Sequence, residues 1–380
     1  MLNKKIYCLF HFILFFLLGS AQSQLFPFLK QLELSNYEIS LVYAGIAFSF
    51  MLGQIIIGIL CDYTNTYKRW MVGLIILSTI ATVILFMKGF HIGIYMVASI
   101  LVGSVYKVMT NLLETWTLQK ESKQYGYIRC YGAVGFTLGA WLCGYVLKDH
   151  VHLLIYMFLL FCDSLILYCL YYIEVKKEKK YPICFGDIKK LLCTRRYMFV
   201  VLILFLLYAI GSVDQYVVVA KLSHIHASKL QISTKYAIQS AMEIPVYYFM
   251  NTIFKKYSSL QLMRIASIGY GIKFFLYGYF QAIYKLLWCT TLQMITLPIV
   301  LLAGKKLVSE VTPSTVFASS QMIAMAVFMG CSGFVTPFVC MKGIQYVGYD
   351  QTLYYASMLT IVPYILLWIF GYSIKTNVKK

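Results

Sequence analysis

Long apolar runs separated by short charged clusters recur along the whole chain, and this pattern constrains the fold more than any single motif does. Of the 380 residues, 61% are hydrophobic and only 12% are charged, whereas a soluble domain is about half apolar and a quarter charged. A helix needs ~20 residues to cross the hydrocarbon core of a bilayer, and the runs have that length. The loops between them are too short for a soluble catalytic or nucleic-acid-binding domain. The sequence therefore predicts an all-α membrane protein.

The limits of the apolar runs predict twelve transmembrane helices. They lie near 6–29, 39–60, 70–87, 92–117, 128–147, 152–173, 197–220, 232–254, 261–280, 286–304, 317–340 and 353–372. The longest polar stretch, 174–196, would be a cytoplasmic loop between a six-helix bundle at 1–173 and another at 197–380. Two pseudo-symmetric bundles that rock about a midplane site are the architecture of many secondary transporters. The first run is too long for the core of a signal peptide, so we expect it to be retained.

Lysine dominates the formal net charge of +19, since 28 of the 33 basic residues are Lys. They stand in short clusters between the apolar runs, which is typical of topology signals rather than of a nucleic-acid-binding surface. Alternating the loops between faces puts 23 basic residues on one side and eight on the other, and this tally counts Lys221, Lys235 and Lys305 as loop charges. The bias predicts a multi-pass protein of the plasma or inner membrane with both termini cytoplasmic.

The sequence offers little support for metal or enzyme chemistry. Its eleven cysteines lie mostly inside apolar runs without CxxC spacing, so we infer neither a disulfide framework nor a metal site. HExxH, a GxSxG in a suitable context and paired aspartates on adjacent helices are missing. We therefore expect no enzymatic activity, no cofactor and no nucleic-acid partner, with a membrane-embedded enzyme as a weaker alternative.

A charged motif follows the second expected helix. Gly58 and Asp62 near its end are followed by Lys68 and Arg69, and this pattern resembles the loop signature of the major facilitator superfamily. Asp62 at a helix end can accept hydrogen bonds or face a neighbouring helix N-terminus, while the basic pair stays in water. Asn65 stands where the family usually has a turn glycine, and Asn tolerates left-handed backbone better than most residues. A generic charged turn is the alternative interpretation.

The segment 125–136, YGYIRCYGAVGF, resembles the start of the fifth helix in lactose permease and its oligosaccharide:proton symporter relatives. Gly132, Gly135 and the later Gly139 would let a neighbouring helix approach closely. The resemblance covers most of the chain. It implies the twelve-helix facilitator fold and transport of a small polar solute.

By resemblance, Glu114 and Arg129 correspond to the carboxylate and guanidinium that hold sugar hydroxyls in those relatives, and Phe136 to the aromatic that stacks on the sugar. A carboxylate accepts hydrogen bonds from hydroxyls, and a guanidinium donates a planar fork. Arg129 as a snorkelling topology charge and Phe136 as a lipid-facing residue are the alternatives. Gln24 in the first expected helix is a further polar candidate for the substrate site.

Lys107 shares a helix face with Glu114 at i,i+7. One interpretation is that Lys107 adds positive charge to a substrate cavity and selects a solute with a carboxylate. The alternative, which the sequence supports equally, is that Lys107 has a structural role and that Glu114 neutralises its charge. For Asp163, in the sixth expected helix, no motif applies, and we expect a packing or interhelical hydrogen-bonding role.

The seventh, eighth and ninth expected helices each contain one charged residue at a position that resembles the family, namely Asp214, Glu243 and Lys273. In the relatives, the carboxylate at the Glu243 position belongs to the substrate-coupling machinery. A charged group inside hydrocarbon costs roughly a few kcal/mol on insertion scales, so pairing or exposure to a cavity is expected. By resemblance, these residues would couple solute binding to protonation. A purely structural buried ion pair is the alternative.

The tenth expected helix departs from the relatives. Gln293 replaces their histidine and Thr296 their glutamate, and neither side chain titrates near neutral pH. Thr290 replaces the lysine that partners the seventh-helix Asp. These replacements argue against proton coupling of the permease type and leave Glu243 as the group that would carry a proton.

We therefore predict a secondary transporter that moves a small polar solute, such as a sugar or a nucleoside, by alternating access. Its expected partners are that solute, the lipid bilayer and protons as coupling ion, and we expect a monomer. A uniporter and a transporter of aromatic acids are alternatives within transport. A sensor or scaffold that keeps the fold without moving a solute is the alternative from another class.

Overall fold

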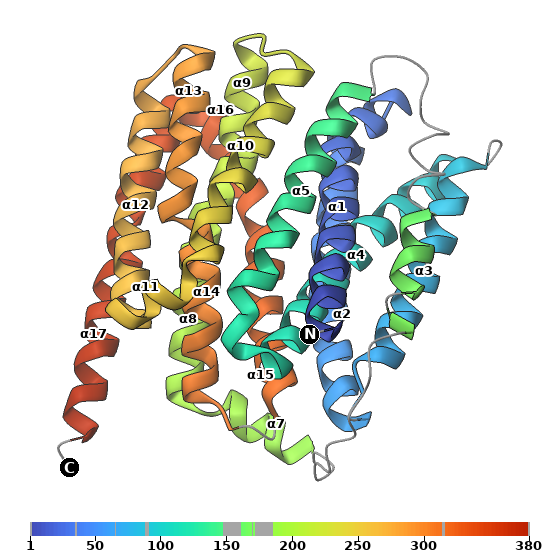
Figure 1. Cartoon of the computed structure of the whole chain (residues 1–380). Helices are drawn as coiled ribbons and strands as arrows, with labels where there is room; N and C mark the ends of the chain where they lie inside the picture. Colours follow the sequence, from blue (N-terminus) through green and yellow to red (C-terminus); the bar gives the residue numbers. More distant parts are fainter. Residues whose placement is uncertain are drawn as a thin grey trace. The chain divides into compact units, whose positions relative to one another are not determined.

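The computed structural model describes residues 2–34, 36–64, 66–87, 91–146, 161–168, 170–171, 185–313 and 316–378. Regular structure in these ranges is entirely helical, without a strand, which confirms the predicted all-α fold (Figure 1). The chain divides into two compact units, Met1–Ile183 and Cys184–Lys380. We refer to them as unit 1 and unit 2.

The long helices of unit 1 match the first five predicted runs. They are α1 (Leu2–Gln31), α2 (Asn36–Thr64), α3 (Lys68–Phe86), α4 (Ile92–Lys120) and α5 (Tyr125–Val146), with a short 3-10 turn η1 (Ser122–Gln124) before α5. Of the sixth predicted helix, 152–173, residues 161–168 and 170–171 are helical, and its other residues lie outside the described part. Helix α4 is central, because every residue from 108 to 117 is buried. A helix buried on all sides belongs to the core of a bundle.

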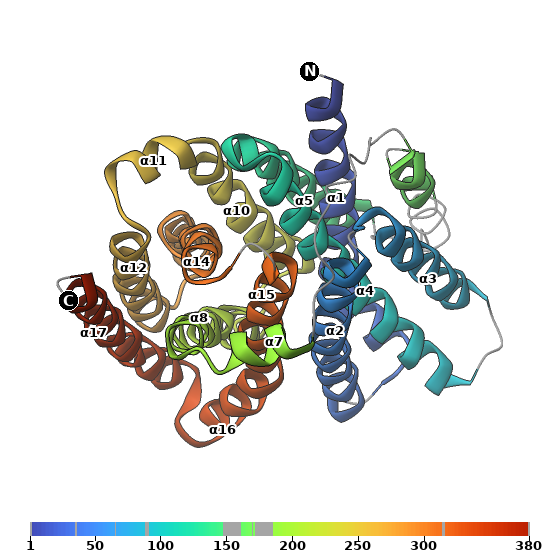
Figure 2. The ribbon, with the colours of Figure 1, turned by 90° about the horizontal axis from the view of Figure 1, so that it is seen from below.

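Unit 2 contains the second set of predicted runs. Its elements are α7 (Phe185–Leu192), α8 (Arg195–Val213), η2 (Asp214–Val218), α9 (Val219–His224), α10 (Lys229–Tyr248), α11 (Met250–Lys256), α12 (Ser259–Tyr279), α13 (Ile283–Cys289), η3 (Thr290–Ile295), α14 (Leu297–Val311), α15 (Phe317–Met325), η5 (Ala326–Cys331), α16 (Ser332–Leu359) and α17 (Ile361–Val378). Figure 2 shows α14 enclosed by α8, α10, α12 and α15. Of the predicted loop 174–196, residues 174–184 lie outside the described part, and α7 forms within the rest.

Several helix limits in unit 2 follow directly from local chemistry. Ser228 and Ser258 begin α10 and α12 with capping boxes, in which the serine hydroxyl accepts from the N–H of the residue three positions later and a glutamine there accepts in return. Gly348 has φ 83° within the span of α16. That left-handed backbone favours glycine and ends one helix where the next begins.

Seven segments among the described residues are long and apolar enough to cross a membrane. The longest, Phe317–Tyr372, has 56 residues and would measure about 84 Å as one helix, far more than a bilayer. The turn at Gly348 divides it, in agreement with two predicted crossings. Helices α10 and α12 are absent from the seven because polar residues, including Lys235 and Lys273, interrupt their apolar sequence.

Glycines allow α1 and α5 to pack backbone against backbone in unit 1 (Figures 1 and 2). A Cβ on Gly135 would meet the backbone carbonyl of Phe12, and one on Gly139 would meet that of Phe16. From the other side, a Cβ on Gly19 would lie 2.5 Å from the Phe136 carbonyl oxygen. The prediction that the α5 glycines serve close helix approach is confirmed.

We expect Gly135→Ala to destabilise unit 1, because the added methyl group meets backbone that can move only if α1 and α5 separate. The expected loss is about 1–3 kcal/mol, measured as a lower apparent melting temperature of the purified protein in detergent. Gly73→Ala in α3 is the matched control, since a Cβ there meets nothing within 4 Å. Equal melting temperatures for the two variants would contradict the close packing of α1 and α5.

Candidate functional site

A buried ion pair joins α4 and α5 in unit 1. Arg129 Nε lies 2.5 Å from Glu114 Oε1, and the Tyr125 hydroxyl donates to Glu114 Oε2 over 3.3 Å. Glu114 is 4% exposed and Arg129 is 6% exposed. The sequence placed these two residues at the substrate site, and the structure brings their side chains together. A guanidinium buried against a carboxylate is not in the position of a snorkelling charge.

An aromatic stack from α1 supports the Arg129 side chain. The guanidinium carbon lies 4.0 Å from the centroid of the Phe15 ring, a cation–π contact. The Phe15 ring stacks in turn on His11 with a centroid distance of 5.9 Å. His11 Nε2 is 2.9 Å from Thr117 Oγ1 of α4. Phe15 and His11 were not predicted, and their four-residue spacing on one face of an expected helix is the only signal that could have indicated them.

The remaining predicted substrate residues of unit 1 lie at different positions around this pair. Lys107 precedes Glu114 by two turns on the same face of α4 and is partly buried. Phe136 follows Arg129 by two turns on α5 and is also partly buried. Gln24 lies in α1, but its side chain is outside the described residues.

The predicted loop motif lies at the junction of α2 and α3. Gly58 and Asp62 are buried in the last two turns of α2, and Arg69 is exposed at the start of α3. Lys68 Nζ donates to the backbone carbonyl of Tyr171 over 3.3 Å. The motif therefore links α3 to the helical residues that follow 160. Asn65 lies outside the described part.

Asp163 forms a separate buried cluster in unit 1. It is 1% exposed, and Thr79 Oγ1 donates to its Oδ2 over 2.9 Å. The Tyr106 hydroxyl donates to its Oδ1 over 3.2 Å. Because these donors come from α3 and α4, the expected interhelical hydrogen-bonding role is confirmed.

In unit 2, one aspartate holds two lysines. Asp214 Oδ1 lies 2.7 Å from Lys235 Nζ, and Asp214 Oδ2 lies 2.6 Å from Lys273 Nζ. Gln239 Nε2 also donates to Oδ2 over 2.7 Å. The three charged side chains are at most 2% exposed. A buried ion pair gains little stability over apolar packing, whereas losing one partner is costly.

Gln293 connects this cluster to Glu243. Lys273 Nζ donates to Gln293 Oε1 over 2.6 Å, and Gln293 Nε2 donates to Glu243 Oε1 over 3.2 Å. The Tyr247 hydroxyl donates to Glu243 Oε2 over 3.2 Å. The predicted coupling residues Asp214, Glu243 and Lys273 are thus members of one hydrogen-bonded network. Its two ammonium groups and two carboxylates balance in charge.

Two irregular backbone segments carry parts of this network. Asp214 begins the π-helical segment η2, and Gln293 lies in the 3-10 segment η3. Thr296 then has non-helical backbone before Pro298 in the first turn of α14, where a proline is tolerated at the start of a helix but would interrupt one that continued through it. π segments often occur at functional sites, and discontinuous helices often form the binding sites of transporters.

Lys235 and Gln239 were not predicted as members of this site. Together with Glu243 and Tyr247 they repeat every four residues along α10, so all four lie on one face. That spacing could have indicated them, but Lys235 was counted as a loop charge. Thr290, which replaces the expected lysine partner, is instead within 3.0 Å of the Tyr277 hydroxyl. The partners of Asp214 come from α10 and α12.

Two further lysines counted as loop charges are buried. Lys221 Nζ lies 2.7 Å from Asp350 Oδ1 and donates to the carbonyls of Tyr277 and Phe280 at the end of α12. Lys305 is 3% exposed in α14. Their assignment to loops was wrong, because the position of a lysine near a helix end does not show whether its side chain turns to water or inward. The cytoplasmic position of the termini stays a prediction.

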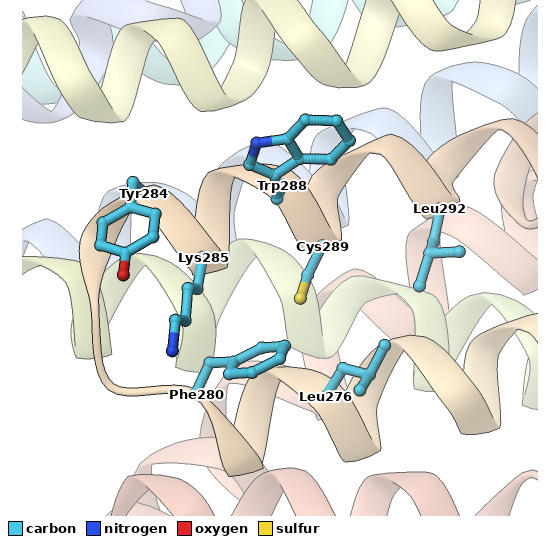
Figure 3. Close-up of a pocket in the computed structure, with 7 residues that line it drawn as sticks. All are labelled: Leu276, Phe280, Tyr284, Lys285, Trp288, Cys289 and Leu292. Atoms are coloured by element: carbon cyan, nitrogen blue, oxygen red, sulfur yellow. The ribbon is translucent and has the colours of Figure 1, made fainter.

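A surface groove in unit 2 has a different character. It is lined by Leu276, Phe280, Tyr284, Lys285, Trp288, Cys289 and Leu292 of α12, α13 and η3 (Figure 3). Trp288 is 73% exposed, and its indole points away from the helix in the close-up. Exposed aromatic side chains with one lysine are typical of a membrane interface. The groove has no carboxylate among its lining residues, and its chemistry differs from that of the network.

No group of three or more His, Cys, Asp or Glu side chains within the described ranges could hold a metal ion. The two buried arrangements instead offer hydrogen-bond donors and acceptors. In unit 1, a carboxylate and a guanidinium can bind hydroxyl groups. In unit 2, a neutral network contains carboxylates that can exchange a proton.

Two comparisons by sequence address the family. The model of the MFS_1 like family matches residues 5–355. Maltose permease from Geobacillus stearothermophilus is 25% identical over 157 residues, which is 39% of this chain. That match spans 38% of the permease, so the aligned part is well under half of either protein.

Solved structures resemble the whole chain in fold. The nucleoside transporter NupG has a TM-score of 0.72 at 14% identity and covers 98% of this chain and 99% of its own. The E. coli fucose:proton symporter FucP has a TM-score of 0.71 at 12% identity, with 97% and 98% covered. The human organic anion transporter MFSD10 has a TM-score of 0.72 at 14% identity, with 96% and 99% covered. These likenesses confirm the predicted membrane fold.

We expect Asp214→Asn to destabilise unit 2 by roughly 3–5 kcal/mol, because two buried ammonium groups lose their carboxylate. Adding Lys235→Met should recover part of the loss, since Lys273 and Glu243 then balance. Apparent melting temperatures of the purified variants measure both effects.

The matched control adds Lys256→Met, which removes an exposed lysine at the end of α11. This control should recover nothing. If Lys235→Met also recovers nothing, the charges do not form one balanced network.

Proposed function

Because the chain belongs to the MFS_1 like family, we propose that it is a secondary transporter that moves a small polar solute across the membrane by alternating access. The observation that carries this proposal is the presence of buried ion pairs inside long membrane helices, Glu114 with Arg129 and Asp214 with two lysines. Such charges are costly in a bilayer and typically mark solute or proton sites. A sugar or a nucleoside is the substrate class that we propose, since the similar proteins are named as transporters of maltose, nucleosides and fucose.

The unit 1 ion pair supplies the chemistry for binding hydroxyl groups. Glu114 would accept from solute hydroxyls, while the guanidinium of Arg129 would donate from a plane fixed by Phe15. We propose Phe136 as the aromatic that packs on the solute ring, from its position two turns along α5. Asp62, Lys68 and Arg69 would serve the conformational change at the α2–α3 junction.

For coupling, we propose Glu243 as the proton carrier. Protonation would remove the negative charge that accepts from Gln293, and Asp214 would then be the one carboxylate of the network opposite Lys235 and Lys273. The network would then respond to protonation although Gln293 and Thr296 do not titrate. Uniport is the second candidate, favoured by those two replacements. We further propose a monomer in the cell membrane with cytoplasmic termini.

A sensor or scaffold with the same fold is the alternative from another class. It would need no solute movement, and solute counterflow in proteoliposomes would exclude it. An aromatic-acid transporter is the alternative substrate class. A thermal-shift screen with sugars, nucleosides and aromatic acids separates these classes, because a bound ligand stabilises the native state.

Arg129→Lys tests the solute site. It keeps the charge and removes the planar fork, so we expect proteoliposome uptake of the solute found in that screen to fall at least about tenfold. Arg196→Lys, an exposed position at the start of α8, should transport normally. Normal uptake by correctly inserted Arg129→Lys protein would remove Arg129 from the solute site.

Glu243→Gln tests proton coupling. We expect this variant to retain solute counterflow but to lose uptake driven by a proton gradient, because the amide cannot carry the proton. The measurement compares uptake with and without an imposed gradient in the same vesicle preparation. Wild-type uptake that is indifferent to the gradient would contradict symport and favour uniport.

A further inference from the structure

Lys107 is partly buried and lies in the mostly buried half of α4, two turns before Glu114 on the same face. Asn111 lies between them on that face, so these side chains form a polar stripe over about 10 Å of the helix. The rest of this part of α4 is apolar or carries small hydroxyl groups. The stripe leads directly to the Glu114–Arg129 pair.

Glu114 does not neutralise Lys107. Its carboxylate is already held by Arg129 at 2.5 Å and by the Tyr125 hydroxyl. Two helical turns separate Lys107 from it along the axis. No carboxylate oxygen of the described residues lies within 4.0 Å of the Lys107 ammonium group. The structure therefore answers the question that the i,i+7 spacing left open.

Asp163 does not neutralise Lys107 either. Its carboxylate accepts from Thr79 and Tyr106. Tyr106 precedes Lys107 by one residue, which turns its side chain by about 100° around the helix. Asp163 therefore faces a different side of α4 and has its own donors.

Three lysines of unit 2 show how this chain pairs a buried ammonium group with a carboxylate. Lys221, Lys235 and Lys273 each have a carboxylate oxygen at 2.6–2.7 Å. These contacts match the rule that buried charges are paired. Lys107 differs from them because no described side chain supplies its counter-charge.

We propose that the counter-charge of Lys107 is the carboxylate of the transported solute. The substrate would then be a small organic acid that also carries hydroxyl groups. Its carboxylate would bind Lys107, and its hydroxyl groups would bind Glu114 and Arg129 at the other end of the stripe. This inference rests on the proposed transport function, and it assigns to the hydroxyl-bearing solute a negative charge that neutral sugars and nucleosides lack.

The first test needs no ligand. Removing an uncompensated charge should leave the ligand-free protein as stable as before or more stable, whereas removing a member of a structural ion pair should destabilise it. We expect the apparent melting temperature of Lys107→Gln to equal or exceed that of the wild type. A clear decrease would overturn the proposal. Lys5→Gln, an exposed lysine of α1, is the control and should have no effect.

The second test uses matched pairs of an acid and its neutral analogue. The pairs are D-glucuronate with D-glucose, and 4-hydroxybenzoate with 4-hydroxybenzyl alcohol. At least one acid should raise the melting temperature of the wild type and of Lys107→Arg more than its analogue does. Lys107→Gln should bind that acid roughly 10- to 150-fold more weakly, as expected for a hydrogen bond to a charged group.

The inference and the transport function fail in different ways. If neither acid stabilises the wild type more than its neutral analogue, or if Lys107→Gln responds equally, the anion proposal is overturned. Counterflow of D-glucose in the same liposomes would then still support a transporter. The absence of counterflow for every member of both pairs would count against the transport function as well as against the inference.

Discussion

An ionised side chain inside a membrane bundle requires a counter-charge, and the interior of each unit is organised around this requirement. Unit 1 places Glu114 against Arg129, and unit 2 places Asp214 between Lys235 and Lys273. Such pairs add little net stability compared with apolar packing. Their presence in helices that must cross hydrocarbon is therefore explained by a function that needs charge at depth.

The two units use different backbone structures to bring their buried charged groups together. In unit 1, α4 and α5 are regular in the described residues, and the close approach of α1 to α5 lets Phe15 lie over Arg129. In unit 2, the π segment at Asp214 and the break at Thr296 shift side chains relative to a regular helix. Irregular backbone exposes polar groups that need partners. Lys235 supplies one, since its ammonium group also donates to the Asp214 carbonyl over 3.3 Å.

Much of the fold follows from the apolar runs, because hydrocarbon imposes a length and a polarity on every crossing. The glycine spacing in α5 and the pairing of Glu114 with Arg129 were also accessible from sequence. The π segments were not, since no residue pattern specifies them as proline specifies the break before α14. Lys235 was missed because a lysine near a helix end has the same sequence signature whether it turns to water or inward. Only the partner on another helix distinguishes these two cases.

Charge balance also explains the departure of the tenth predicted helix from its relatives. The resemblance to the permeases implies a lysine partner for Asp214 at the position of Thr290. Without such a partner, Asp214 and Glu243 would face Lys273 alone, which would leave one buried carboxylate in excess. Lys235 on α10 supplies the second positive charge from a different helix, and the Gln293 amide, which does not titrate, bridges Lys273 and Glu243 by hydrogen bonds. The network thus holds two carboxylates and two cations in balance, which is the condition under which charges can stay buried inside membrane helices.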